Sequence, residues 1–144
     1  MTTISWIYQA NPIHYDIDCA LKRYHSIEWL SKRYRKEVQI NDKVGMWKSG
    51  INGGLIALAT VTSEPKIKRT IRDDPCEKTK SKFVNPQWRV DLHFDRIFNE
   101  PIYRKKFLLH PILSQMQIFK QPFAANPFKV STLESSALLK IIDD

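Results

Sequence analysis

The chain has 144 residues, of which 42% are hydrophobic and 26% charged, a mixture typical of one folded domain over residues 1–144 and too short for a multidomain machine. Lys and Arg outnumber Asp and Glu by 23 to 15, giving a net charge of +8, so a polyanion is the first partner to consider. No apolar stretch approaches the ~18 residues of a membrane-spanning helix and no signal peptide is recognisable, which predicts a soluble cytoplasmic domain with no membrane partner.

The first part of the chain predicts a strand followed by a short helix. Ile4–Ala10 is rich in β-formers and stops at Asn11-Pro12, a turn signal. Asp16 is a suitable N-cap for the helix that follows. The apolar residues of this helix recur at helical spacing: Ile17, Leu21 and Tyr24.

Two strands and a long loop are predicted next. Lys43–Ser49 and Leu55–Thr62 are β-rich and flank the glycine-containing loop Gly50–Gly54. Pro65 closes the second strand. Residues 66–87 carry many charged residues and prolines and few large apolar ones, which predicts an exposed basic loop.

Residues 88–95 show the clearest alternation in the chain. Apolar side chains occupy every second position, as in an antiparallel strand with one buried face. The apolar positions are Trp88, Val90, Leu92 and Phe94. The polar positions are Arg89, Asp91, His93 and Asp95.

Helices dominate the predicted C-terminal part. Residues 103–120 favour short helical pieces interrupted at His110-Pro111. Phe128–Val130 leads into Ser131–Glu134, a capping box, and a helix to about Ile142 follows. The predicted order has no regular βαβ alternation. It indicates an α+β fold: a small mixed, mostly antiparallel β-barrel with peripheral helices.

The two cysteines, Cys19 and Cys76, lie far apart and form no CxxC pair. This spacing predicts neither a disulfide framework nor a zinc ribbon, and it is typical of a reducing compartment. Cys76 is expected in the exposed loop.

Basic side chains gather in two parts of the chain. Residues 22–48 hold eight basic and three acidic residues, and residues 66–82 hold seven basic and three acidic ones. These two segments account for the whole positive excess. Neutralising backbone phosphates releases counterions, so such clusters favour nucleic acid. A solvated basic surface without a partner is the alternative.

Aromatic residues lie beside the first basic cluster. Trp29 is expected in a loop after the first helix, just before the basic run that starts at Lys32. An indole in that position can stack on a base, which is worth roughly 1–3 kcal/mol. Burial in the core is the commoner role of a single tryptophan. Trp88 is in phase with the core face of its strand, and Trp47 could point either way.

Several motifs together resemble those of the EVE domain, a member of the PUA-like superfamily that is related in fold to YTH domains. The resemblance extends from about Trp6 to Ile142. The motifs that carry it are Trp6–Pro12, Tyr15–Asp18, Glu28-Trp29, Arg33–Glu37, Asp42–Val44, Trp47–Gly50 and Phe128–Val130. Domains of this type stand alone or precede McrB-like motor proteins in modification-dependent restriction systems.

The resemblance implies a β-barrel with a pocket for a modified base. In YTH domains an aromatic cage receives that base, and Trp29 and Trp88 match its walls by order. Asn11, just after the first strand, would bind a base edge. The other residues implied to surround the base are Leu30, Ser31, Trp47, Ser49, Gly50, Phe123 and Asn126. The residues expected to hold phosphates are Arg33, Arg35, Lys36, Lys48 and Lys129.

No pattern in the chain points to catalysis. The histidines lack metal-binding spacing, and no histidine lies next to a cysteine to activate it. We therefore expect no catalytic residue, metal or cofactor. Some ASCH-type relatives in the PUA-like superfamily are hydrolases, so Lys48 with Glu28 or Glu64 would be the candidates for a small nucleoside hydrolase.

The sequence therefore leads to one main hypothesis and two alternatives. The main hypothesis is a module that takes a modified base, most readily a methylated one, out of its stack and into an aromatic cage. DNA is favoured over RNA as the partner, and a restriction nuclease or motor would lie on another domain or chain. The alternatives are a general RNA-binding PUA-like domain without a modification preference and the ASCH-like hydrolase.

Overall fold

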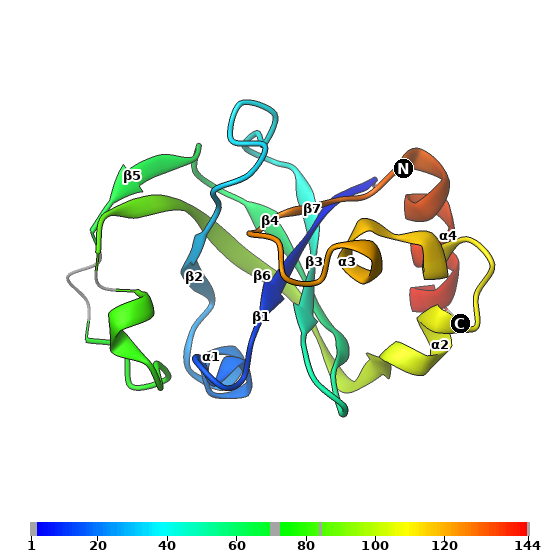
Figure 1. Cartoon of the computed structure of the whole chain (residues 1–144), viewed down its shortest axis with the longest axis horizontal. Helices are drawn as coiled ribbons and strands as arrows, with labels where there is room; N and C mark the ends of the chain where they lie inside the picture. The colour runs from blue at the N-terminus through cyan, green and yellow to red at the C-terminus, as the bar shows by residue number, and fades with distance from the viewer. Residues whose placement is uncertain (1–2, 70–72, 84, 144) are drawn as a thin grey trace.

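A seven-stranded sheet forms the centre of the molecule, with helices at its periphery (Figure 1). The computed structural model describes residues 3–69, 73–83 and 85–143. In chain order the elements are β1 (Ile4–Ala10), α1 (Ile17–Arg23), β2 (Ser26–Leu30), β3 (Lys43–Lys48), β4 (Gly54–Val61), β5 (Lys66–Lys68), the 3-10 turn η1 (Lys80–Lys82), β6 (Gln87–Tyr103), α2 (Arg104–Leu108), the 3-10 turn η2 (Leu113–Gln115), α3 (Gln117–Lys120), β7 (Phe128–Lys129) and α4 (Thr132–Asp143).

The strands pair in the order β2-β6-β4-β3-β1-β7, and β5 pairs with β6. The β1–β3 pair is parallel and the other pairs are antiparallel. The predicted α+β class with a mixed, mostly antiparallel sheet is therefore confirmed. None of the helices in the described part of the chain is long and apolar enough to cross a membrane.

The sheet curls until β2 at one edge approaches β1 near the other. The indole Nε1 of Trp29 in β2 donates to the carbonyl of Gln9 in β1 at 3.2 Å. Just after β2, the Arg33 backbone N–H donates to the carbonyl of Asn126 at 2.9 Å. Over the described residues no strand ladder joins β2 to β1, so the predicted barrel is an open sheet with a seam between these two strands.

Two hydrophobic cores lie on either side of the curled sheet. One packs α1 against the strands of the sheet, β2 included, and contains Tyr8, Trp29 and Leu92. The other lies beneath α2, α3 and α4, which group at one end of the molecule in Figure 1, and it contains Phe107, Leu113 and Leu138. The seam opens beside the first core.

Local sequence signals predicted several elements correctly. β1 has the predicted bounds, and the Asp16 side chain caps α1 by accepting from the Cys19 backbone N–H at 3.0 Å. The capping box forms in both directions: the Ser131 N–H donates to Glu134 Oε1 at 2.9 Å, and the Glu134 N–H donates to Ser131 Oγ at 3.1 Å. β6 contains the predicted alternating segment but is longer, with 17 residues.

β2 is one element that the sequence interpretation missed. The residues expected to form a loop before Trp29 instead pair with β6 in an antiparallel ladder. Ile27 and Trp29 are buried in this strand while Ser26 is exposed. This is the period of two expected for a strand with one buried face, and the short length of the segment hid it.

The prediction of an exposed loop over residues 66–87 is wrong for a substantial part of it. β5 lies in this range, and Asp74, Cys76 and Phe83 are buried. The lysines of the segment are exposed, as predicted, apart from Lys68. Residues 70–72 and 84 of this prediction lie outside the described residues.

Cys19 in α1 and Cys76 form a disulfide, so the prediction that their spacing excludes a disulfide framework is wrong. Cys76 is 1% exposed. The two residues meet because the segment around Cys76 packs on α1: the Asp16 N–H donates to the Cys76 carbonyl at 2.8 Å, and the Tyr15 hydroxyl donates to Asp74 Oδ2 at 2.7 Å. Because the two cysteines are paired, their spacing no longer indicates a reducing compartment.

Candidate functional site

A cavity of about 460 Å³ opens at the seam between β1 and β2. Its walls come from the end of β1 and the turn after it, from β2, from the segment before and at the start of β6, and from the loop before β7. Five predicted site residues line it: Asn11, Trp29, Leu30, Trp88 and Asn126. The other lining residues are Gln9, His14, Tyr15, Lys32, Lys82, Phe83, Pro86, Gln87, Ala124 and Ala125.

Trp29 forms a rigid part of the wall. Its side chain is only 4% exposed. The Tyr15 ring meets it edge-on with centroids 4.8 Å apart, and the Phe83 ring lies 6.0 Å away. Together with the hydrogen bond to Gln9, these contacts fix the orientation of the indole. Trp29 thus belongs to the core and to the cavity at once.

Trp88 is half-buried, unlike the fully buried Val90 and Leu92 that follow it on the same face of β6. Trp88, which the sequence placed both in phase with the core face of its strand and as a wall of the cage, is thus only partly buried. The Arg35 guanidinium carbon lies 4.5 Å from the centre of the Trp88 ring, a favourable cation–π distance. Trp88 and Trp29 both line the cavity, and each comes from a different strand.

The Gln9 carbonyl joins the parts of the cavity wall. It accepts from Trp29 Nε1 and also from Asn126 Nδ2 at 2.9 Å, while Asn126 Oδ1 accepts from the Gln9 N–H at 2.7 Å. Asn126 thereby binds β1 as a neighbouring strand would. Asn11 Oδ1 accepts from the Ile13 N–H at 3.0 Å. The amide nitrogen of Asn11 makes no hydrogen bond within the described chain, so it can donate to a ligand.

Arg33 supports the loop before β7, whereas the sequence assigned it to phosphates. Its guanidinium donates to carbonyl oxygens of that loop and to two glutamine side chains, one in α3 and one directly after it. The acceptors are the Ala125 carbonyl at 2.7 Å, Gln121 Oε1 at 2.9 Å, and Gln117 Oε1 and the Pro127 carbonyl, both at 3.2 Å. With these contacts made, the guanidinium has little capacity left for an anion.

Two further predicted phosphate ligands also have internal partners. Lys48 Nζ lies 2.6 Å from Asp18 Oδ2, and Lys129 Nζ lies 3.3 Å from Glu37 Oε1. Lys36 and Arg35 are exposed. The exposed Lys32 and Lys82 line the cavity and were missed as site residues. Each belongs to one of the two basic clusters, but a count of charges along the chain does not show which lysines meet.

The remaining predicted base contacts lie outside the main cavity. Trp47, Ser49, Gly50 and Phe123 line a second hollow of about 150 Å³, which shares Gln9 and Asn11 with the first. Ser31 lies behind the wall. Its hydroxyl is 2.7 Å from the Tyr8 hydroxyl, and its backbone N–H donates to the Trp88 carbonyl at 2.8 Å.

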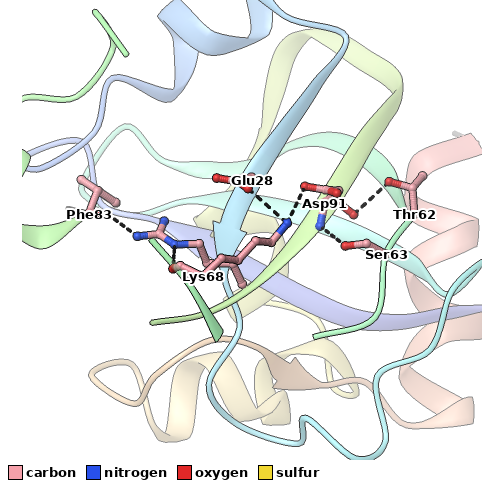
Figure 2. Close-up of polar contacts among 7 residues, drawn as sticks. Glu28, Thr62, Ser63, Lys68, Phe83 and Asp91 are labelled. Atoms are coloured by element: carbon pink, nitrogen blue, oxygen red, sulfur yellow. Dashed lines mark hydrogen bonds and ion pairs between the residues drawn. The ribbon is translucent and has the colours of Figure 1, made fainter. Parts of the chain in front are cut away.

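A polar network behind the cavity holds the segment that supplies Phe83. Lys68 in β5 lies between Glu28 at 3.1 Å and Asp91 at 3.5 Å (Figure 2). Arg89 was expected on a solvated face but is 2% exposed. It donates to the Lys68 carbonyl at 3.0 Å and to the Phe83 carbonyl. Burial lowers the pKa of Arg89, and these carbonyls partly replace its lost hydration.

The groups considered for catalysis do not come together. Lys48 forms an ion pair with Asp18, and Glu28 forms one with Lys68. The three candidates, Lys48, Glu28 and Glu64, are not among the residues that line the main cavity. Within residues 3–69, 73–83 and 85–143, no group of three or more His, Cys, Asp or Glu side chains is placed to hold a metal ion.

The role of Arg33 can be tested against its exposed neighbour. We expect Arg33→Lys to lower the free energy of unfolding by about 2 kcal/mol, because an ammonium cannot reproduce the planar set of donors. Arg35→Lys, which alters only a surface cation–π contact, should change it by less than about 1 kcal/mol. Urea unfolding of both variants measures the difference, and equal values would contradict the assigned support role.

The fold is shared with solved structures of low sequence identity. A hypothetical protein from Leishmania major is 20% identical, with a TM-score of 0.74 over 99% of this chain and 96% of that one. Human THYN1, solved in complex with DNA containing 5-methylcytosine, is 16% identical, with a TM-score of 0.67 over 97% and 98%. The YTH domain of the Zygosaccharomyces rouxii MRB1 protein, in complex with N6-methyladenosine RNA, is 8% identical, with a TM-score of 0.57 over 98% and 89%.

No curated protein sequence is similar enough to the chain to count as a match. The family model of the EVE domain, in contrast, matches residues 5–141, which is nearly the whole chain. The expectation drawn from the sequence motifs is thus confirmed, and the chain belongs to the EVE domain family.

Proposed function

We propose that this chain is a nucleic-acid-binding module that holds a modified base, rotated out of its stack, in the cavity at the seam. The observation that carries the proposal is that Trp29 and Trp88, from two different strands, line the same cavity of about 460 Å³. That volume lies within the usual range for small-molecule sites. A flat heterocycle between indole rings gains stacking energy without any requirement for one particular base.

The groups around the cavity suit a nucleotide. The free amide N–H groups of Asn11 can donate to an acceptor on the base edge. Lys32 and Lys82 are exposed and line the cavity, so each can approach a phosphate next to the extruded base. Extrusion costs a few kcal/mol. Stacking and phosphate contacts are the terms that can offset this cost.

The solved structures support the class of ligand. THYN1 was solved with DNA containing 5-methylcytosine and the MRB1 YTH domain with N6-methyladenosine RNA. Both ligands carry a methylated base. We propose a methylated base for this chain too, with DNA as the favoured strand and a modification-dependent restriction system as the setting. The nuclease or motor would then lie on another domain or chain, and no catalytic step is assigned here.

A panel of labelled oligonucleotides tests the proposal. Strands of one sequence would carry cytosine, 5-methylcytosine, 5-hydroxymethylcytosine, adenine or N6-methyladenine, as DNA and as RNA, and fluorescence anisotropy at fixed salt would give the affinities. We expect one modified strand to bind up to about tenfold more tightly than its unmodified counterpart, because one buried methyl contributes only about 1 kcal/mol.

Two results would count against this function. Equal affinity for modified and unmodified strands would favour the general RNA-binding alternative. A preference for modified RNA over modified DNA would argue against a restriction setting. A salt series belongs in the same experiment, because phosphate contacts make affinity fall as salt rises, and the modification preference should persist as overall affinity falls.

A further inference from the structure

Phe123 is a fully exposed aromatic ring at the tip of a tight turn. The turn spans residues 121–124 and is closed by a hydrogen bond from the Ala124 N–H to the Gln121 carbonyl at 3.0 Å. Pro122 occupies the second position, which proline favours in such turns. Phe123 in the third position therefore projects away from the body of the turn.

The turn is anchored on both sides. Gln9 Nε2 donates to the Pro122 carbonyl at 3.1 Å. Arg33 donates to the Gln121 side chain at 2.9 Å and to the Ala125 carbonyl at 2.7 Å. Several hydrogen bonds to β1 and to the segment after β2 thus hold the backbone that carries the ring. Because the backbone of the turn is already held in place, little backbone conformational entropy is lost when the ring meets a ligand.

This turn forms the boundary between the two hollows. Ala124 and Ala125, which follow Phe123, line the main cavity, and Phe123 itself lines the second hollow. Both hollows share Gln9 and Asn11. The ring therefore lies beside the cavity that is proposed to receive the base. From there it can contact the nucleotides on either side of the extruded base.

We propose that Phe123 is a wedge: when a base leaves a duplex for the cavity, the phenyl ring enters the base stack at the vacated position. The inference rests on the proposed function and adds a residue that promotes extrusion from a duplex. Removing a base leaves its two neighbours unstacked and exposes the orphaned partner base to water. An inserted apolar side chain covers these surfaces, as wedge residues of DNA-bending proteins do.

A wedge acts only where a stack has to be opened, which makes it separable from the cavity. In a single strand the base is already accessible, so the ring should add little to binding. In a duplex the ring should contribute about tenfold to affinity, the scale of one aromatic–base stacking contact. The ratio of duplex to single-strand affinity is therefore the quantity to measure.

The test compares Phe123→Ala with Leu109→Ala, a control at a side chain that is 75% exposed and lines none of the cavities described above. Both changes are on the surface, and thermal unfolding should show that both variants stay folded. Anisotropy would be measured with a single strand and with a duplex, each carrying the modified base that the wild type prefers. We expect Phe123→Ala to lower duplex affinity about tenfold and single-strand affinity less than twofold, and Leu109→Ala to change neither.

Three results would overturn the wedge: no loss with Phe123→Ala, an equal loss on both substrates, or a wild type that binds the single strand but not the duplex. The proposed function has a separate readout in the same experiment, the preference of the wild type for modified over unmodified single strands. A wild type that keeps this preference while Phe123→Ala has no effect would remove the wedge alone. Loss of the preference would remove the proposed function.

Discussion

Replacing Trp88 with alanine is expected to lower affinity for the preferred modified strand about tenfold and to leave affinity for the unmodified strand within about twofold. The reason is that Trp88 lines the cavity with its half-buried ring, so its removal deletes a stacking surface while the exposed lysines remain. The free energy of unfolding should fall by no more than about 1 kcal/mol, because the side chain is not fully buried. Anisotropy and urea unfolding measure the two quantities.

Truncating Trp29 to alanine is expected to differ from truncating Trp88 in its cost to stability. Trp29 is 4% exposed and packs against Tyr15 and Phe83, so its truncation should cost about 3–5 kcal/mol of stability and would confound any loss of binding. Trp29→Phe keeps a ring in the wall and is the better probe there. An equal loss of modified and unmodified binding in Trp88→Ala would contradict the cage, since it would mean that the ring contacts every strand alike.

The parts of the fold that the sequence predicted are those fixed by neighbours in the chain. Asp16 caps α1 because its carboxylate needs only the N–H three residues ahead, and Ser131 and Glu134 form their capping box for the same reason. The alternation in β6 depends on one buried face. These signals lie within a few residues, so no knowledge of the tertiary structure was required.

The cavity could be predicted only in part, because its walls depend on long-range packing. The sequence singled out Trp29 and Asn11, whose positions the family resemblance suggested, but nothing local indicated that Gln9 joins them through its carbonyl. Phe83 was hidden in a segment classed as an exposed loop. It reaches the cavity because Arg89 holds its carbonyl from within the core.

Charge counts along the chain do not show which basic side chains are free to meet an anion. Arg33, Lys48 and Lys129 were selected for their place in basic stretches, and each has internal partners in the fold. Lys32 and Lys82 come from different clusters and both line the cavity. A side chain's availability for phosphate depends on which carbonyls and carboxylates lie near it, and this is a property of the folded chain.

Removing the Cys19–Cys76 disulfide is expected to lower the free energy of unfolding by about 3–4 kcal/mol, because the bond closes a long loop in the unfolded chain. The effect should extend to the cavity. Cys76 precedes Lys82 and Phe83 in one segment, and that segment is bound to the turn after β1: the Lys78 N–H donates to the His14 carbonyl at 2.8 Å. Loosening it would displace two lining residues and weaken binding of the modified strand.

Urea unfolding with and without dithiothreitol would measure this change in the wild type and in a Cys19→Ser/Cys76→Ser double variant. The wild type should lose stability on reduction and become similar to the double variant, which should not respond to the reductant. Binding assays under the same conditions should show a parallel loss of affinity. A reduced wild type that unfolds at the same urea concentration as the oxidised one would contradict a stabilising disulfide. Lower stability with unchanged affinity would mean that the hydrogen bonds to the turn after β1 are enough to keep Phe83 and Lys82 in place at the cavity.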